Sequence, residues 1–118
     1  MIAKQYRFQG QNGLRYVYRR GQSLRTKYAR LQFTNNPHRT SYRAAVVVSK
    51  KVAKSAPLRN RIRRRIYEAI REYAPQHLSH QDIVLTVYDP SLGICDYSDI
   101  RQLVRRFLVD VASHTKAR

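Results

Sequence analysis

The sequence has few acidic residues, and they are unevenly placed. Only 7 of its 118 residues are Asp or Glu, against 24 Lys and Arg, which gives a net charge of +17. Residues 1–67 contain 18 basic side chains and no acidic one, whereas residues 68–118 contain 6 basic and 7 acidic side chains. The first part of the chain therefore cannot neutralise its own charge with internal ion pairs. A positive field of this kind attracts phosphate chains.

Cysteine and long apolar runs are also scarce. A single cysteine, Cys95, excludes an internal disulfide and a Cys-x-x-Cys metal site. No apolar run approaches the roughly 18 residues of a membrane span, and the start, MIAKQYRFQG, lacks the apolar core of a signal peptide. We therefore expect a cytoplasmic protein with no membrane partner. His77 and His80 have no third ligand close in sequence, so we predict no metal site in the chain.

The acids do not suggest catalysis by protein side chains. They are Glu68, Glu72, Asp82, Asp89, Asp96, Asp99 and Asp110. A metal-dependent nuclease needs several carboxylates that converge on divalent ions, and the spacing of these seven shows no such cluster. No Ser/His/Asp or Cys/His arrangement is apparent either. We predict no catalytic residue in the chain, which we expect to bind rather than cut.

The hydrophobic content, 42%, is ordinary for a folded protein. With this length it predicts a single domain over residues 1–118. We expect residues 1–10 to form a flexible, irregular basic arm and residues 114–118 a flexible tail.

The first half is predicted to hold a short helix and two strands. Asn12 can cap the helix, and Gly21 ends it. Apolar and polar residues alternate over residues 27–33, which predicts a half-buried strand. The more continuous β-branched run over residues 42–49 predicts an inner strand.

PLRNRIRRRIYEAIR, residues 57–71, carries six arginines and one acid. Ser55 is a suitable N-cap for a helix here, and Pro75 is expected to close it. Its core-facing stripe is predicted to be Ile62, Ile66, Ala69, Ile70 and Tyr73. Arg61, Arg64 and Arg65 fall on the opposite side, where they can meet a polyanion.

The second half is predicted to be a strand followed by a helix. Residues 82–88 form another apolar, β-rich run. The last helix is indicated by an unbroken apolar spacing at Ile100, Leu103, Val104, Phe107, Leu108 and Val111. The order is helix, strands, basic helix, strand, helix. It predicts an α+β fold with three helices and a small mixed sheet of about four strands.

A basic loop leads into the arginine-rich helix. In SKKVAKSAPLRNR, residues 49–61, a strand ends in Ser-Lys-Lys and is followed by Arg-Asn-Arg. This pattern resembles the signature of the bacterial ribonuclease P protein component. YVYRRGQS, residues 16–23, is similar to that family's first helix, and the length and order of elements also agree. The resemblance covers nearly the whole chain.

The resemblance implies a small basic subunit of a holoenzyme that removes the 5′ leader from precursor tRNA. The partner RNA would carry the chemistry with bound Mg²⁺, and no organic cofactor is implied. The residues implied to contact the catalytic RNA are Lys50, Lys51, Lys54, Arg59, Asn60, Arg61, Arg63, Arg64 and Arg65. Those implied to contact the leader are Leu14, Tyr18, Gln32 and Phe33, of which the last two are alternatives for one sheet position. The family also implies a left-handed strand–helix–strand crossover, against the usual hand.

Two other readings of the composition remain. A ribosome-associated structural RNA-binding protein would share the basic character and the small α+β fold. A DNA-binding regulator would need a mixed polar recognition face, whereas a helix of nearly uniform arginine suits phosphates better than bases. We therefore expect an RNA partner and no DNA partner.

Overall fold

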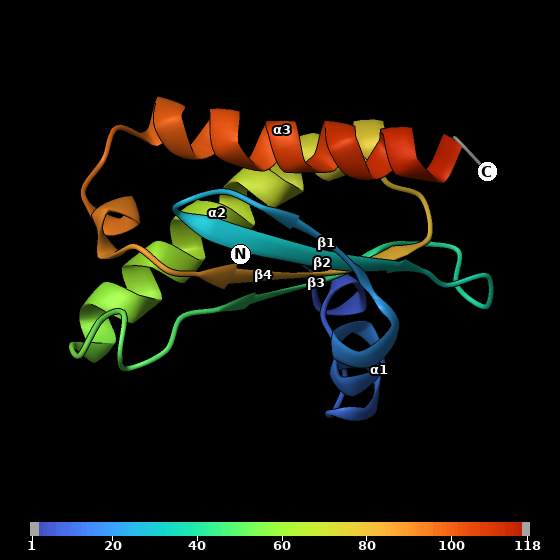
Figure 1. Ribbon diagram of the computed structural model, residues 1–118, viewed down its shortest axis with the longest axis horizontal. Coiled ribbons are helices and arrows are strands. Elements are labelled where there is room, and N and C mark those ends of the chain that lie inside the picture. The colour runs from blue at the N-terminus through green and yellow to red at the C-terminus, as the bar shows by residue number, and fades with distance from the viewer. Residues whose placement is uncertain (1–2, 117–118) are drawn as a thin grey trace.

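A four-stranded sheet separates two long helices from a short one (Figure 1). The computed structural model describes residues 3–116. Its helices are α1 (Asn12–Arg20), α2 (Ala56–His77) and α3 (Tyr97–Lys116), and its strands are β1 (Gln22–Arg25), β2 (Ala29–Asn35), β3 (Arg43–Val47) and β4 (Gln81–Val87). Two 3-10 turns, η1 (Lys4–Tyr6) and η2 (Pro90–Gly93), complete it. α2 and α3 cover one face of the sheet, and α1 lies on the other (Figure 1).

The strands lie in the order β1-β2-β4-β3. β1 and β2 pair antiparallel, as do β2 and β4, whereas β3 and β4 pair parallel with α2 as their connection. The predicted α+β fold, with a mixed sheet and three helices, is confirmed. The hand of the β3–α2–β4 crossover stays a prediction.

Register gives the sheet two different faces, because side chains alternate along each strand. Leu31 lies opposite Leu85 and points to the core, whereas its neighbour Gln32 lies opposite Val84 and points to the α1 side. The helices add the predicted stripes to the core, where the fully or almost fully buried side chains include Ile62, Ile66, Ile70, Ile100, Val104 and Leu108. We call the α1 side the outer face of the sheet.

α2 begins as predicted and ends later than predicted. The Ser55 hydroxyl accepts a hydrogen bond from the Leu58 N–H, so the N-cap is confirmed. Pro75 lies inside the helix, which runs on to His77. A proline in the last turn removes only one helical hydrogen bond, and the Leu78 N–H closes the turn on the Ala74 oxygen at 2.7 Å.

β3 is an edge strand, so the predicted inner position is wrong. Its apolar sequence is explained by what covers it. The Val46 N–H donates to the Tyr67 hydroxyl of α2 at 3.1 Å, and Arg7 forms a parallel bridge with Ala44. The edge is therefore shielded from water by a helix and by the N-terminal segment.

Both ends contain more regular structure than predicted. Within the expected irregular arm, η1 forms, and Tyr6 stacks on Tyr42 with ring centroids 4.5 Å apart. α3 continues to Lys116, so the predicted tail is helical over residues 114–116. Residues 1, 2, 117 and 118 lie outside the described part. Over residues 3–116, no helix combines the length and the apolar character that a membrane span needs.

Candidate nucleic-acid interface

The basic loop and the start of α2 form one exposed cationic surface. Lys50, Lys51 and Lys54 are exposed in the loop, and Asn60, Arg61 and Arg64 are exposed on the helix. A hollow of about 490 Å³ is lined by Pro57, Asn60, Arg63 and Arg64. The structure therefore brings the predicted loop and helix residues into one neighbourhood, beside the positive end of the α2 dipole.

Arg59 has a different position from its neighbours. Its Nη1 donates to the main-chain oxygens of Ala53 at 2.8 Å and Lys54 at 2.9 Å. The guanidinium thereby fixes the loop on the first turn of α2. Arg59 shapes the cationic surface, while the exposed lysines beside it are free to reach a ligand.

Arg65 does not face solvent as the helical spacing predicts. It is half-buried, and it donates to the main-chain oxygens of Leu92, at 2.7 Å, and Cys95. η2 packs closely on α2 at Gly93, where a Cβ would lie 2.5 Å from Leu58 Cδ1, so a larger residue would require the Leu58 side chain to move. Arg63 is also engaged, through a hydrogen bond to the Asn60 side-chain oxygen.

The second surface lies where α1 meets the outer face of the sheet. α1 starts at Asn12, with Gln11 as the residue before it and no side-chain cap, so the predicted Asn12 cap is wrong. Val17 is fully buried. Gly21 ends the helix as predicted, and a Cβ there would lie 2.4 Å from the Val17 oxygen and 3.1 Å from the Phe33 oxygen. Glycine therefore allows the end of α1 to rest directly on β2.

Beside α1, the outer face of β2 contains buried polar atoms without hydrogen-bond partners in the described chain, and we call this part of β2 the floor. Arg30, Gln32 and Thr34 alternate along the outer face of β2. Arg30 Nε, Gln32 Oε1 and Thr34 Oγ1 are each buried without a hydrogen bond within the described chain. A buried polar atom without a partner costs about 1–3 kcal/mol, so a polar ligand on this floor would recover part of that cost.

Leu14 and Tyr18 belong to α1, which lies on the outer-face side of the sheet (Figure 1). Leu14 is half-buried and Tyr18 is 43% exposed. They lie on one flank of the helix, because residues four apart share a side. Tyr16 and Arg20 lie on the other flank, against Thr34 and Asn35. Leu14 and Tyr18 therefore lie on the flank of α1 opposite Tyr16 and Arg20, while Gln32 lies on the outer face of β2. That the three residues bind one leader together stays a prediction.

Of the two predicted alternatives for the sheet position, Phe33 points its side chain to the core, away from α1. It is 3% exposed on the core face and makes an edge contact with His114 of α3, with centroids 5.8 Å apart. The alternation along β2 sends Phe33 inward and Gln32 outward. Strand periodicity in the sequence contained this signal, because Ala29, Leu31 and Phe33 share a face.

The acids are dispersed and several are ion-paired. Asp82 is buried and accepts two hydrogen bonds from Arg43, at 2.9 and 2.7 Å, and one from Asn36 at 3.1 Å. The hydrogen bond to Asp82 raises the pKa of Arg43 above its ordinary value. Glu72 accepts from Arg101 at 2.7 Å. Across residues 3–116, no three His, Cys, Asp or Glu side chains gather into a group that could hold a metal ion.

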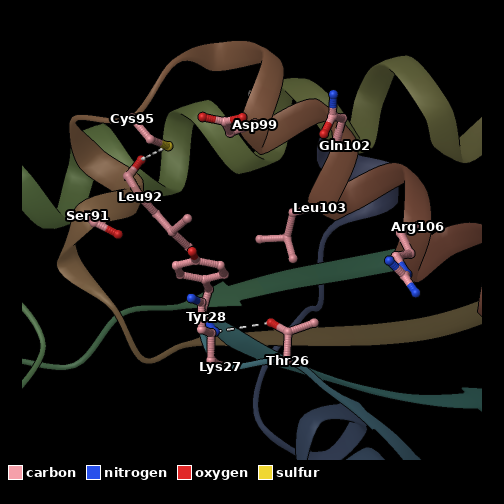
Figure 2. A pocket seen from close by; sticks show the side chains of 10 residues that line it. All are labelled: Thr26, Lys27, Tyr28, Ser91, Leu92, Cys95, Asp99, Gln102, Leu103 and Arg106. Atoms are coloured by element: carbon pink, nitrogen blue, oxygen red, sulfur yellow. Dashed lines mark hydrogen bonds between the residues drawn. The ribbon is translucent and has the colours of Figure 1, made fainter.

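A separate hollow, of about 450 Å³, lies between the β1–β2 turn and the start of α3. Figure 2 shows the side chains of Tyr28 and Leu103 within it and the Cys95 thiol turned toward the Leu92 oxygen, 3.9 Å away. Asp99 adds an acid to its lining. None of the predicted site residues lines this hollow, so it is separate from both surfaces described above.

Comparison with known proteins gives consistent matches. A family model described as Ribonuclease P matches residues 2–112. The ribonuclease P protein component of Prochlorococcus marinus is 45% identical over 64 residues, 48% of this chain and 50% of that protein. The chain thus spans about half the length of this relative. The corresponding protein of Roseiflexus castenholzii is 31% identical over 107 residues, 91% of this chain and 86% of the relative.

The same fold is found in a solved structure. The RNase P protein of Staphylococcus aureus aligns with a TM-score of 0.75 and 23% identity, over 91% of this chain and 94% of that one. At this identity the likeness shows the fold alone.

Proposed function

Because the chain belongs to the ribonuclease P protein family, we propose that it is the RNA-binding subunit of a ribonuclease P holoenzyme. In this proposal it binds a catalytic RNA and the single-stranded 5′ leader of precursor tRNA in the cytoplasm. The holoenzyme then cleaves the leader endonucleolytically and produces the mature 5′ end. The observation that carries the proposal is the exposed cationic surface at the loop and the start of α2, with the exposed Tyr18 ring on α1 as a separate feature on the outer face.

The cationic surface suits the catalytic RNA. Lys50, Lys51 and Lys54 provide point charges on the loop, and Arg61 and Arg64 provide planar groups that can bind phosphate through two parallel hydrogen bonds. Arg59 and Arg65 support this surface from behind, because their guanidinium groups are already hydrogen-bonded to main-chain oxygens.

The surface where α1 meets the outer face suits a single strand. Unpaired bases are recognised by stacking on aromatic rings and by hydrogen bonds to their edges. Tyr18 offers an exposed ring, and Gln32 Oε1 and Arg30 Nε are buried on the outer face of β2 without a partner in the described chain. Stacking of one base on Tyr18 would contribute about 1–3 kcal/mol to substrate affinity.

We assign the chemistry to the RNA. Mg²⁺ would activate the attacking water and stabilise the leaving oxygen, as metal ions do in phosphodiester hydrolysis. The described part of the chain offers no cluster of ligands for such an ion. The role of the protein residues is therefore to bind and orient: α2 positions the catalytic RNA, and α1 with β2 holds the leader.

Reconstitution tests this proposal. Purified protein, free of RNA, is added to its cognate catalytic RNA at low Mg²⁺, and cleavage of precursor tRNA is followed. The protein should restore cleavage that the RNA alone performs poorly at that Mg²⁺ concentration, and the protein alone should be inactive. Failure to stimulate, combined with co-sedimentation of the protein with ribosomes, would favour the ribosome-associated alternative.

A further inference from the structure

Tyr16 is an exposed aromatic side chain that neither surface described above uses. It is 55% exposed, more than Tyr18 on the same helix. At about 100° of rotation per residue, Tyr16 and Tyr18 project from opposite flanks of α1. A large exposed ring on a basic helix is a group on which a nucleotide base can stack.

Two hollows meet at Tyr16. One, of about 490 Å³, extends toward the first turn of α1 and the loop after β2; the other, of about 140 Å³, extends toward Arg20 and Gln22. Both are lined by Tyr16, Thr34 and Asn35. Tyr16 therefore borders both hollows and lies between them.

The floor of this region offers a free hydrogen-bonding group. Thr34 points to the outer face, and its Oγ1 is buried without a partner in the described chain. A hydroxyl can both donate and accept, so it can pair with a base edge or a ribose hydroxyl. Thr34 lines both hollows, as Tyr16 does.

The charge around Tyr16 favours an anion. Arg20 is exposed on the same flank, one helical turn from Tyr16. Asp82 is the acid in the lining of the larger hollow, and Arg43 neutralises it through a bidentate pair. An aromatic ring, an unpaired hydroxyl and a free guanidinium, with no unpaired acid in the two linings, are the groups that recognise a nucleotide.

We propose that the Tyr16 flank of α1 is a second site for single-stranded RNA. One base stacks on Tyr16, the Thr34 hydroxyl bonds to that nucleotide, and Arg20 contacts a phosphate. The inference rests on the proposed function, because it adds a second RNA contact to the same protein. The nucleotide belongs either to the 5′ leader or to an unpaired segment of the catalytic RNA, and the chemistry of recognition is the same for both.

The experiment compares Tyr16→Ala with wild type in the reconstituted holoenzyme, and Tyr18→Ala is the matched control from the other flank. In one arm, affinity is measured for precursor tRNAs whose leaders are lengthened one nucleotide at a time. In the other arm, affinity of each protein for the catalytic RNA is measured without substrate. Thr34→Val, which removes the hydroxyl and keeps the shape, is carried through both arms, and thermal unfolding checks that all variants fold.

The expected result is a loss of about tenfold for Tyr16→Ala in one arm only, with a smaller loss in the same arm for Thr34→Val. A loss that begins at a certain leader length identifies the leader as the ligand, and a loss in assembly identifies the catalytic RNA. Wild-type affinity of both variants in both arms would overturn the inference while wild-type cleavage still supports the proposed function. If wild-type protein itself fails to stimulate cleavage, the proposed function fails instead.

Discussion

Arg65, near the middle of α2, donates a hydrogen bond of 2.7 Å to the main-chain oxygen of Leu92 in η2. A second bond from the same guanidinium reaches the Cys95 oxygen. Together they tie the basic helix to the segment that leads into α3. One arginine next to the cationic surface is thus a structural residue, although the neighbouring Arg64 is exposed.

Replacing Arg65 should therefore affect folding. Arg65→Ala removes charge-assisted bonds to two carbonyls and leaves those oxygens half-buried, which should lower the free energy of unfolding by about 1–3 kcal/mol. Arg64→Ala is the matched control: it should leave unfolding unchanged and weaken binding to the catalytic RNA. Urea titrations of both variants measure the first effect. Equal stability of the two variants would show that the Arg65 contacts contribute nothing.

The buried pair of Arg43 and Asp82 should be strongly coupled. Their side chains are 16% and 3% exposed, and removing one partner leaves a poorly solvated charge. Asp82→Leu should cost about 3 kcal/mol of unfolding free energy, because it leaves Arg43 unpaired. The double variant Arg43→Met with Asp82→Leu should cost clearly less than the sum of the two single changes. Additive losses in this double-mutant cycle would contradict the coupling.

The contact of Gly21 with β2 predicts that a methyl group there will displace α1. Gly21→Ala places a Cβ 2.4 Å from the Val17 oxygen of α1 itself and 3.1 Å from the Phe33 oxygen of β2, unless the backbone moves. Overpacking of this kind should lower the unfolding free energy by about 1–3 kcal/mol. Because α1 carries Tyr18, the same variant should also weaken leader binding while assembly with the catalytic RNA is kept. Unchanged stability and leader binding would show that α1 shifts at no cost.

Tyr42 predicts a loss of stability at high pH. Burial, followed by the smaller influence of Tyr6, raises the pKa of Tyr42 to about 12, from about 10 for a free tyrosine. The folded chain therefore holds this proton more tightly than the unfolded chain does. The resulting stabilisation is complete below pH 10 and disappears as pH rises toward 12.

Tyr42→Phe isolates this effect from the titration of lysines over the same range. The unfolding free energy of wild type should fall more steeply than that of the variant between pH 10 and 12. Parallel pH profiles of the two proteins would refute the role of Tyr42.

Local patterns in the sequence were sufficient for most of the fold. The isoleucine stripe of α2 and the apolar spacing of α3 both lie in the core, because a helix buries whichever face is apolar. β1 could not be predicted: its four residues contain only Leu24 as an apolar side chain, and its pairing with β2 is what makes it a strand. The edge position of β3 depends on strand order, which local pattern does not specify.

The candidate site was predictable to the level of elements, and less so for single side chains. Helical spacing puts Arg65 beside Arg61 and Arg64, but its hydrogen bonds are made to η2, about thirty residues later in the chain. Arg59 bonds to the loop for a similar reason. Helical spacing places Tyr16 and Tyr18 on different flanks of α1, but only the burial of Val17 in the structure shows how α1 is turned toward the sheet.

The central claim, that α1 and β2 hold the leader of precursor tRNA, is tested most directly by one pair of affinities. Binding of the reconstituted holoenzyme to precursor tRNA and to mature tRNA is measured for wild type and for Tyr18→Ala. Wild type should bind precursor tRNA more tightly than mature tRNA. Tyr18→Ala should lose about 1–3 kcal/mol for the precursor alone, because only the precursor offers a leader base to stack. Equal weakening for both tRNAs, or no weakening for either, would contradict the account.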